Sequence, residues 1–170
     1  MAKFHSLEVK DIYKDTDDCS VLSFNVPEDL KNVFKFKPGQ YLTLRDTVND
    51  EDIRRSYSLC SSPLDHEWKV AVKQIPEGKF STFVNETLKK GDVLQVMKPM
   101  GRFGIKISET PKNYIFFTAG SGITPILSIL KTHLEMEPNS TFKLFYLNRT
   151  VKSIIFKEEI EQLRNQYFGR

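Results

Sequence analysis

The stretch RRSYSLCSSP, residues 54–63, carries the side chains in this sequence that are best suited to chemistry. In an extended strand, Arg55 and Tyr57 point to the same face because alternate residues share a face. An arginine can bind phosphate through two parallel hydrogen bonds, and a tyrosine beside it could stack on a planar ring. Ser58, on the opposite pleat, could offer its hydroxyl or its backbone N–H to a ring heteroatom. Core or interface packing is the commoner fate of a strand tyrosine, so both interpretations of Tyr57 stay open.

A second anion-binding feature is predicted in PEGKFST, residues 76–82. Gly78 gives this loop freedom, and Ser81 or Thr82 would cap a short helix over FSTFVNETL. The open N–H groups of the first helical turn would then attract a phosphate. Taken alone, the segment fits a plain capped helix equally well. Together with Arg55 on a neighbouring strand, it would clamp a pyrophosphate from two sides.

A glycine-rich turn, TAGSGITP, joins an apolar strand to a helix at residues 118–125. Gly120 and Gly122 allow a sharp turn and a close approach to a ligand. Thr124 suits the N-cap and Pro125 the first helical position, so the helix start favours a phosphate. The turn lacks the third glycine of the GxGxxG fingerprint. A tight turn without a ligand is the alternative, and the strand–turn–helix context favours binding.

Composition excludes several classes of function. The chain has 25 basic and 22 acidic residues and a net charge of +3, which is too small to indicate nucleic-acid binding. Its most basic run, FKFKPG, is typical of a solvated strand face. Cys19 and Cys60 are far apart and the histidines lack ligand spacing, so neither a zinc site nor an iron–sulfur cluster is expected. No signal-peptide pattern or run of about 18 apolar residues occurs, which favours a cytoplasmic protein without membrane contact.

The pattern of elements changes near residue 110. Before it, about six short β-rich runs separated by turn signals predict a closed or nearly closed antiparallel barrel with one short helix. After it, the order strand, helix, strand, helix is predicted over YIFFTA, PILSILKTHLEM, FKLFYL and SIIFKEEIEQLRNQYF. YIFFTA is fully apolar, as a strand buried on both faces would be. We therefore expect two domains, residues 1–110 and residues 111–170.

The second domain is expected to be incomplete. Two strand–helix units are fewer than the four or more strands that a doubly wound sheet usually needs. We therefore expect the sequence to be the N-terminal portion of a longer chain, truncated within this domain and poorly active by itself. The edge of FKLFYL would be left unpaired, which makes self-association through that edge possible.

Several motifs together resemble the ferredoxin–NADP reductase superfamily. FKPGQYL, RSYS, VKQIPEGKFST, PMGRFGI and GSGITP occur in the family's order and spacing and span nearly the whole chain. Within the superfamily, FHSLEV, RRSYSLCSSP, MGRF and LNRT most resemble the reductase components of phenylacetyl-CoA epoxidase systems, which serve phenylacetate degradation. The resemblance implies an all-β antiparallel Greek-key FAD-binding barrel followed by a partial βαβα nucleotide-binding domain.

The resemblance also implies a cofactor site. FAD would be bound by Arg55, Ser56, Tyr57, Ser58, Val72, Lys73, Gly78, Lys79, Phe80 and Ser81. The nucleotide of NAD(P)H would meet Gly120, Gly122, Thr124 and Arg149, although Arg149 reads equally well as a solvated loop residue. Tyr57, Ser58 and Thr124 would lie closest to the reacting rings. Cys60 would pack on its strand, with a role beside the flavin as the lesser alternative.

The implied activity is an NAD(P)H-dependent flavin oxidoreductase. It would pass electrons through FAD to an iron–sulfur protein or domain and to an oxygenase component. Relatives often carry a ferredoxin domain with C-x4-C-x2-C spacing, which this chain lacks. Two alternatives remain: the same fold serving another acceptor, such as cytochrome b5 or a dihydroorotate dehydrogenase, or a non-catalytic interaction module with an empty flavin site.

Overall fold

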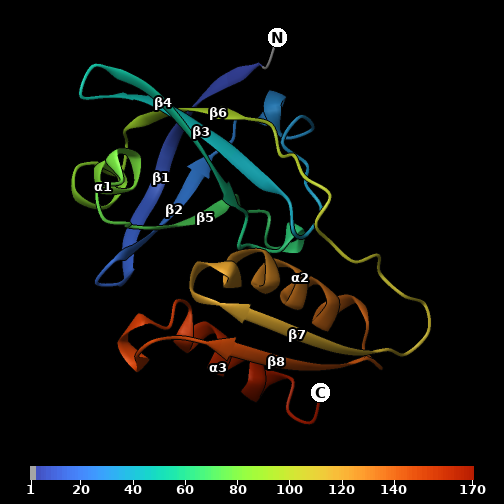
Figure 1. Ribbon diagram of the computed structural model, residues 1–170. Coiled ribbons are helices and arrows are strands. Elements are labelled where there is room, and N and C mark those ends of the chain that lie inside the picture. Colours follow the sequence, from blue (N-terminus) through green and yellow to red (C-terminus); the bar gives the residue numbers. More distant parts are fainter. Residues whose placement is uncertain (1–2) are drawn as a thin grey trace.

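The computed structural model describes residues 3–170 and shows two packed units (Figure 1). The larger unit is a six-stranded antiparallel sheet with the order β4-β3-β6-β1-β2-β5. Its strands are β1 (Phe4–Thr16), β2 (Cys19–Asn25), β3 (Tyr41–Val48), β4 (Glu51–Ser58), β5 (Lys69–Lys73) and β6 (Val93–Met97). The edges β4 and β5 meet just beyond Ser58, through a bridge between Leu59 and Val70 and a 2.9 Å bond from Cys60 N–H to the Lys69 carbonyl. The predicted antiparallel barrel is therefore confirmed.

One short helix, α1 (Lys79–Glu86), packs against the barrel through the buried side chains of Phe80 and Val84. It begins at Lys79, so the prediction that Ser81 or Thr82 caps it was wrong. Ser81 lies inside the first turn, where its hydroxyl donates to the Gly78 carbonyl at 3.0 Å. The basic run FKFKPG is also not a strand. Residues 35–40 form an irregular loop after the buried Phe34.

The smaller unit is a two-stranded parallel sheet with two helices. It consists of β7 (Asn113–Ala119), α2 (Ile123–Met136), β8 (Thr141–Leu147) and α3 (Lys157–Gln166). Side chains from α2, α3 and one face of the sheet form a single apolar cluster, which also includes Cys19, Val21, Cys60 and Ala71 of the barrel. The predicted order of strands and helices is confirmed.

The expectation that YIFFTA is buried on both faces was wrong. Both helices cover the same face of the sheet, so only alternate residues are buried. On the other face, Phe117 and Phe145 are 71% and 49% exposed, and their rings stack at 4.8 Å. Apolar character alone could not distinguish a strand covered on two faces from one covered on one face.

Of the two helices of the smaller unit, α2 begins earlier and α3 begins later than the sequence patterns indicate. α2 begins at Ile123, so Thr124 is its second residue rather than its cap, and its hydroxyl donates to the Ser121 carbonyl at 3.0 Å. α3 begins at Lys157, because the residue before it does not have a helical backbone conformation. Phe156 adopts a left-handed φ of 59°, and its N–H donates to the Asp15 carboxylate at 2.7 Å.

Hydroxyl groups join the two units across a buried interface. Ser128 on α2 donates to the Ser61 carbonyl at 2.6 Å, and the hydroxyls of Ser62 and Thr132 lie 2.9 Å apart. The last residues of RRSYSLCSSP therefore seat α2 on the barrel. Within residues 3–170, no helix is long and apolar enough to cross a membrane.

Candidate functional site

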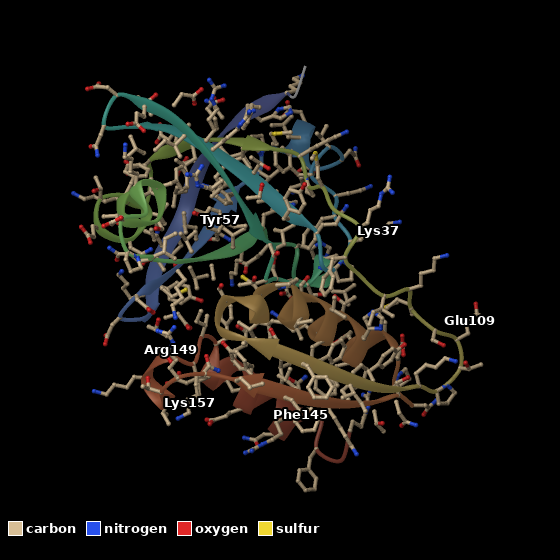
Figure 2. All side chains as sticks on the ribbon, viewed as in Figure 1. Lys37, Tyr57, Glu109, Phe145, Arg149 and Lys157 are labelled. Carbon is tan, nitrogen blue, oxygen red and sulfur yellow. The ribbon has the colours of Figure 1, made fainter. Side chains whose placement is uncertain are left out.

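A cavity of about 1150 Å³ lies between the barrel and the start of α2. Its walls come from β4, β5, the loop that leads into α1, and the first residues of α2. Tyr57, on β4, lies near the middle of the molecule (Figure 2). Segments that are about 70 residues apart in the sequence thus contribute to one cavity, which follows from the way Ser61 and Ser62 seat α2 on the barrel.

Most of the predicted site residues line this cavity. Those present are Arg55, Ser56, Tyr57, Ser58, Lys73, Gly78, Lys79, Phe80, Ser81, Gly122 and Thr124. Three predicted residues do not line it. Val72 is fully buried in the barrel core, Gly120 lies in the turn before α2, and Arg149 is exposed in the loop after β8.

Several lining residues were missed by the sequence analysis. They are Glu51, Asp52, Ile53, Arg54, Ala71, Ile75, Pro76, Glu77, Ser121 and Pro125. Six of them, Arg54, Ile75, Pro76, Glu77, Ser121 and Pro125, lie inside the quoted motifs but were not named as ligands, and the other four lie within a few positions of a motif. Glu51 is different, because only the folded hairpin of β3 and β4 brings it beside Lys79.

The cations of the cavity differ in how they are paired. The Lys73 ammonium lies 3.3 Å from the Asp18 carboxylate, and Lys79 forms an ion pair with Glu51. Among the residues that the structure describes, Arg55 forms no ion pair, and its guanidinium donates only to the Arg54 carbonyl at 2.8 Å. Arg55 is exposed at the cavity wall. Arg54 also lines the cavity and forms no ion pair within residues 3–170, but Arg55 shares its strand face with Tyr57. Arg55 is therefore the cation placed to bind an anionic ligand beside that ring.

The start of α1 forms a second anion-binding element. Its N-cap, Gly78, offers no side chain, and Lys79, Phe80 and Ser81 line the cavity. A Cβ atom at Gly78 would lie 2.4 Å from both the Ile75 side chain and the Ser81 hydroxyl, so only glycine fits there. The free N–H groups of a first helical turn and the helix dipole favour an anion. Arg55 and this helix start thus fit the two sides of a phosphate group.

An aromatic wall lies beside these anion-binding elements. The Tyr57 ring is half-buried and stacks on Phe80, with 6.1 Å between the ring centroids and 25° between the planes. Burial raises the pKa of Tyr57 to about 12, although Arg55 acts in the opposite direction. The phenol therefore stays neutral near pH 7, and a flat, uncharged ring faces the cavity beside the Ser58 hydroxyl.

The α2 side of the cavity is built from backbone and hydroxyl groups. Ser121, Gly122, Thr124 and Pro125 line it, and none of them carries a charge. Gly120 has a left-handed φ of 49°, which turns the chain from β7 into the helix. This wall can meet a polar or anionic ligand through N–H groups rather than through a cation.

Cys60 does not contribute to the cavity. Its side chain is 3% exposed and packs in the apolar cluster under α2. Burial raises the pKa of its thiol, so the thiolate is disfavoured. The interpretation of Cys60 as a packed residue fits this environment.

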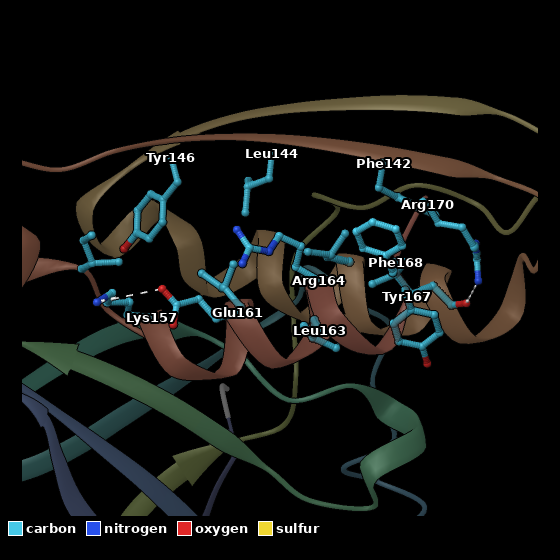
Figure 3. A pocket seen from close by; sticks show the side chains of 15 residues that line it. Phe142, Leu144, Tyr146, Lys157, Glu161, Leu163, Arg164, Tyr167, Phe168 and Arg170 are labelled. Atoms are coloured by element: carbon cyan, nitrogen blue, oxygen red, sulfur yellow. Dashed lines mark hydrogen bonds and ion pairs between the residues drawn. The ribbon is translucent and has the colours of Figure 1, made fainter.

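A second cavity, of about 540 Å³, lies under α3 (Figure 3). Its floor is formed by apolar side chains of α2 and β8 such as Leu134 and Leu144. Arg170 borders it, but its guanidinium is engaged by the backbone carbonyls of Leu134 and Ser140 at 3.1 Å. Lys157, Arg164, Tyr146 and Tyr167 also line this cavity, but none of the predicted site residues does.

Comparisons with known proteins agree with these features. The family described as "Oxidoreductase FAD-binding domain" matches residues 6–105, and the "Oxidoreductase NAD-binding domain" matches residues 116–170. One component of the 1,2-phenylacetyl-CoA epoxidase of Escherichia coli K12 is 42% identical over 168 residues, which cover 98% of this chain and 47% of the relative.

Two further proteins extend this picture. The ferredoxin reductase component of the 3-ketosteroid-9-alpha-monooxygenase of Rhodococcus rhodochrous is 38% identical over 95% of this chain and 46% of the relative. The structure of phthalate dioxygenase reductase superposes with a TM-score of 0.78 and 28% identity, over 92% of this chain and 47% of that one. The chain thus spans about half the length of the curated relatives that it matches.

These matches confirm the resemblance to the ferredoxin–NADP reductase superfamily and to the phenylacetyl-CoA epoxidase reductases. They also fit the geometry, since the first family match covers the barrel and the second covers β7 to α3. The chain belongs to the family of oxidoreductase FAD-binding domains, followed by a segment of the oxidoreductase NAD-binding family.

Proposed function

We propose that this chain is an FAD-dependent oxidoreductase that takes electrons from NAD(P)H and passes them to an iron–sulfur centre or an oxygenase partner. One observation carries the proposal: Arg55, Tyr57 and the uncapped start of α1 line the same cavity as the glycine-rich turn before α2. Relatives that are components of oxygenase systems support it. By the same likeness, the pathway served is aromatic (phenylacetate) degradation in the cytoplasm, where Cys19 and Cys60 stay as free thiols.

The residues on the barrel side fit FAD. Arg55 and the N–H groups at the start of α1 would hold the pyrophosphate, because a bidentate cation and a helix N-terminus are the two strongest phosphate ligands in the cavity. Tyr57 would stack on the flat ring system, and Ser58 would offer its hydroxyl to a ring heteroatom. When bound, FAD supplies both hydride acceptance and one-electron transfer.

The α2 side fits the nicotinamide nucleotide. Gly122 and Thr124 would approach it at the helix start, while Gly120 shapes the turn that presents them. Arg149 would contact the nucleotide only if the ligand extends past the end of β8. Residues 1–110 would thus be the flavin domain and residues 111–170 the opening of the nucleotide domain.

The test compares FAD with riboflavin, which has the same ring system but no phosphate. The purified chain should bind FAD, and riboflavin should bind at least tenfold more weakly because Arg55 and α1 would have nothing to contact. Fluorescence titration measures both affinities, and anaerobic addition of NADH or NADPH should then bleach the bound flavin. A chain that binds no FAD would contradict the flavin site. Equal affinity for both ligands would contradict the pyrophosphate clamp.

A further inference from the structure

A basic and partly apolar surface runs along one side of the barrel, away from α1. We call it the linker face and define it as residues 31–41 and residues 98–107. The two segments are locked together, since a Cβ atom at Gly39 would lie 1.9 Å from the Phe103 carbonyl oxygen. The connection between the two units passes here, on the side opposite α1 (Figure 1). This contact makes the face a built surface rather than a loose loop.

The linker face concentrates positive charge. Six of the chain's 25 basic residues and none of its 22 acidic residues fall in it, so the remaining residues hold 19 basic against 22 acidic, a net charge of −3. The six are Lys31, Lys35, Lys37, Lys98, Arg102 and Lys106. Among residues 3–170, only Lys31 of these six forms an ion pair, with Glu28 at 2.6 Å. Figure 2 shows Lys37 at the barrel edge beside the linker.

Apolar side chains are interspersed among these cations. Val33, Phe103, Ile105 and Ile107 are 41%, 59%, 40% and 42% exposed. Exposed apolar groups surrounded by charge are typical of protein-binding surfaces. A nucleic-acid site would gain nothing from three aliphatic side chains beside its cations, since phosphate contacts dominate such binding.

The face is close to the candidate site. Ser58 lines the cavity and pairs with Tyr41 across β4 and β3. Tyr41 in turn exchanges backbone hydrogen bonds of 2.9 and 3.0 Å with Met100, where the linker begins. Neighbouring strands lie about 4.8 Å apart, so the linker starts roughly 10 Å from the Ser58 wall. Only β3 and β4 would separate a protein bound to this face from the cavity.

We propose that the linker face is the docking surface for the electron acceptor, a protein whose own docking surface combines carboxylates with apolar side chains. This inference rests on the proposed function and adds the place and the chemistry of the partner. The free cations would steer the acidic partner and set its orientation. The apolar part of the face is small. Electron-transfer partners bind transiently and their interfaces are among the smallest, so a small apolar centre suits such a complex.

The test uses an acidic plant-type [2Fe–2S] ferredoxin as the probe and the FAD-loaded chain as the receptor. Calorimetric titration at low and at physiological salt should show binding that weakens as salt is added. The triple variant K35E/K37E/R102E should lose at least tenfold in affinity for the probe. The control K89E/K90E/K152E, with the same change in net charge on exposed lysines elsewhere, should stay within about threefold of the parent.

The outcomes separate the two proposals. Every variant should bind FAD as the parent does, because none of the changed residues lines the cavity. Failure of the parent to bind FAD would overturn the proposed function. Normal FAD binding with equal probe affinity in the two triple variants, or with no probe binding at all, would overturn the docking surface. Tighter binding of the parent to phosphatidylserine vesicles or to duplex DNA than to the ferredoxin would also overturn it.

Discussion

The two sides of the cavity use different chemistry. The barrel side combines the N–H groups at the start of α1 with two side chains: Arg55, which forms no ion pair within residues 3–170, and the neutral aromatic ring of Tyr57. The α2 side offers backbone N–H groups and the Thr124 hydroxyl, and none of its lining residues is charged. This difference indicates that the barrel provides most of the affinity for a phosphorylated cofactor, whereas the α2 side provides orientation.

The two sides also differ in how they are supported. The barrel closes on itself and encloses a continuous apolar core. The sheet of β7 and β8 is covered on one face only, and its unit is seated through hydroxyls such as Ser128 and Thr132. Truncating one polar anchor should therefore disturb the smaller unit more than a comparable change would disturb the barrel.

Glu137 is a polar anchor of a different kind, because it lies within the smaller unit. It is 3% exposed and accepts hydrogen bonds from the Ser108 N–H at 2.9 Å, the Ser140 hydroxyl at 2.7 Å and the Tyr114 hydroxyl at 3.1 Å. His133 Nδ1 lies 2.8 Å away. Burial alone would raise the pKa of Glu137, but these hydrogen bonds outweigh it and hold the pKa below its ordinary value. The carboxylate thus ties the linker, α2 and β7 together.

The largest expected effect comes from Glu137→Ala, which leaves several buried donors without an acceptor. We expect the free energy of unfolding of the smaller unit to fall by about 3–5 kcal/mol. Hydrogen exchange of β7 and β8 amides measures it, and Glu135→Ala, on the exposed side of the same helix, is the control.

Since the folded-state pKa of Glu137 is lowered, the stabilisation that Glu137 provides should be present near neutral pH and should be lost as the pH falls through that pKa. Equal losses in the barrel would contradict the difference in support.

The next effect concerns the charge on the barrel side. Arg55→Ala should weaken FAD binding by about 1.5–3 kcal/mol, roughly 10- to 150-fold, because a charge-assisted contact to phosphate is removed. Arg54 also lines the cavity, but it lies on the opposite pleat from Arg55 and Tyr57, across from Arg45, so Arg54→Ala should cost much less. Flavin fluorescence on titration measures both variants. Equal losses would show that the two arginines share the phosphate and that the assignment of faces is incorrect.

The barrel side of the site was predictable because local rules decide it. Alternation along a strand places Arg55 and Tyr57 on one face whatever the rest of the chain does. Glycines at 78 and 120 mark turns that only they can adopt without strain, as the close contacts at Gly78 and the φ of Gly120 show. The barrel followed from the number and spacing of its strands.

The remaining features depend on tertiary contacts that no local pattern encodes. Val72 is an exception, because the strand alternation that places Ala71 and Lys73 at the cavity turns the Val72 side chain into the core. A longer α3 was predicted because Ile154 and Ile155 continue its apolar spacing. In the structure, the Phe156 N–H donates to the Asp15 carboxylate of the barrel, and the helix begins at the next residue. The open face of β7 and β8 is likewise set by which helices pack on it.

The aromatic wall gives the next effect in size. Tyr57→Ala should weaken flavin binding by about 1.5 kcal/mol and change the visible spectrum of the bound flavin, because a stacked ring is lost. Tyr57→Phe should change both much less, since it keeps the ring that stacks on Phe80. Absorbance spectra and titrations of the two variants decide the matter. If phenylalanine is as damaging as alanine, the hydroxyl rather than the ring carries the interaction.

The smallest effect tests whether the α2 side acts through orientation. Tyr146 on β8 donates its hydroxyl to the Gly120 carbonyl at 2.9 Å, and burial raises its pKa to about 12, so the phenol remains a donor across the physiological range. Tyr146→Phe should free the turn before α2 and weaken NAD(P)H binding by about 1 kcal/mol, while FAD affinity stays unchanged.

Tyr114→Phe is the matched control for this last change. Tyr114 lies under the same helices, but its hydroxyl meets Glu137 at the other end of the sheet, at 3.1 Å. Hydrogen exchange at residues 120–124 should therefore rise in the Tyr146 variant and not in the Tyr114 variant. If both variants expose the turn equally, the hydroxyls act through the general stability of the smaller unit. If neither does, the turn is held by its own backbone, and the α2 side is as self-supporting as the barrel.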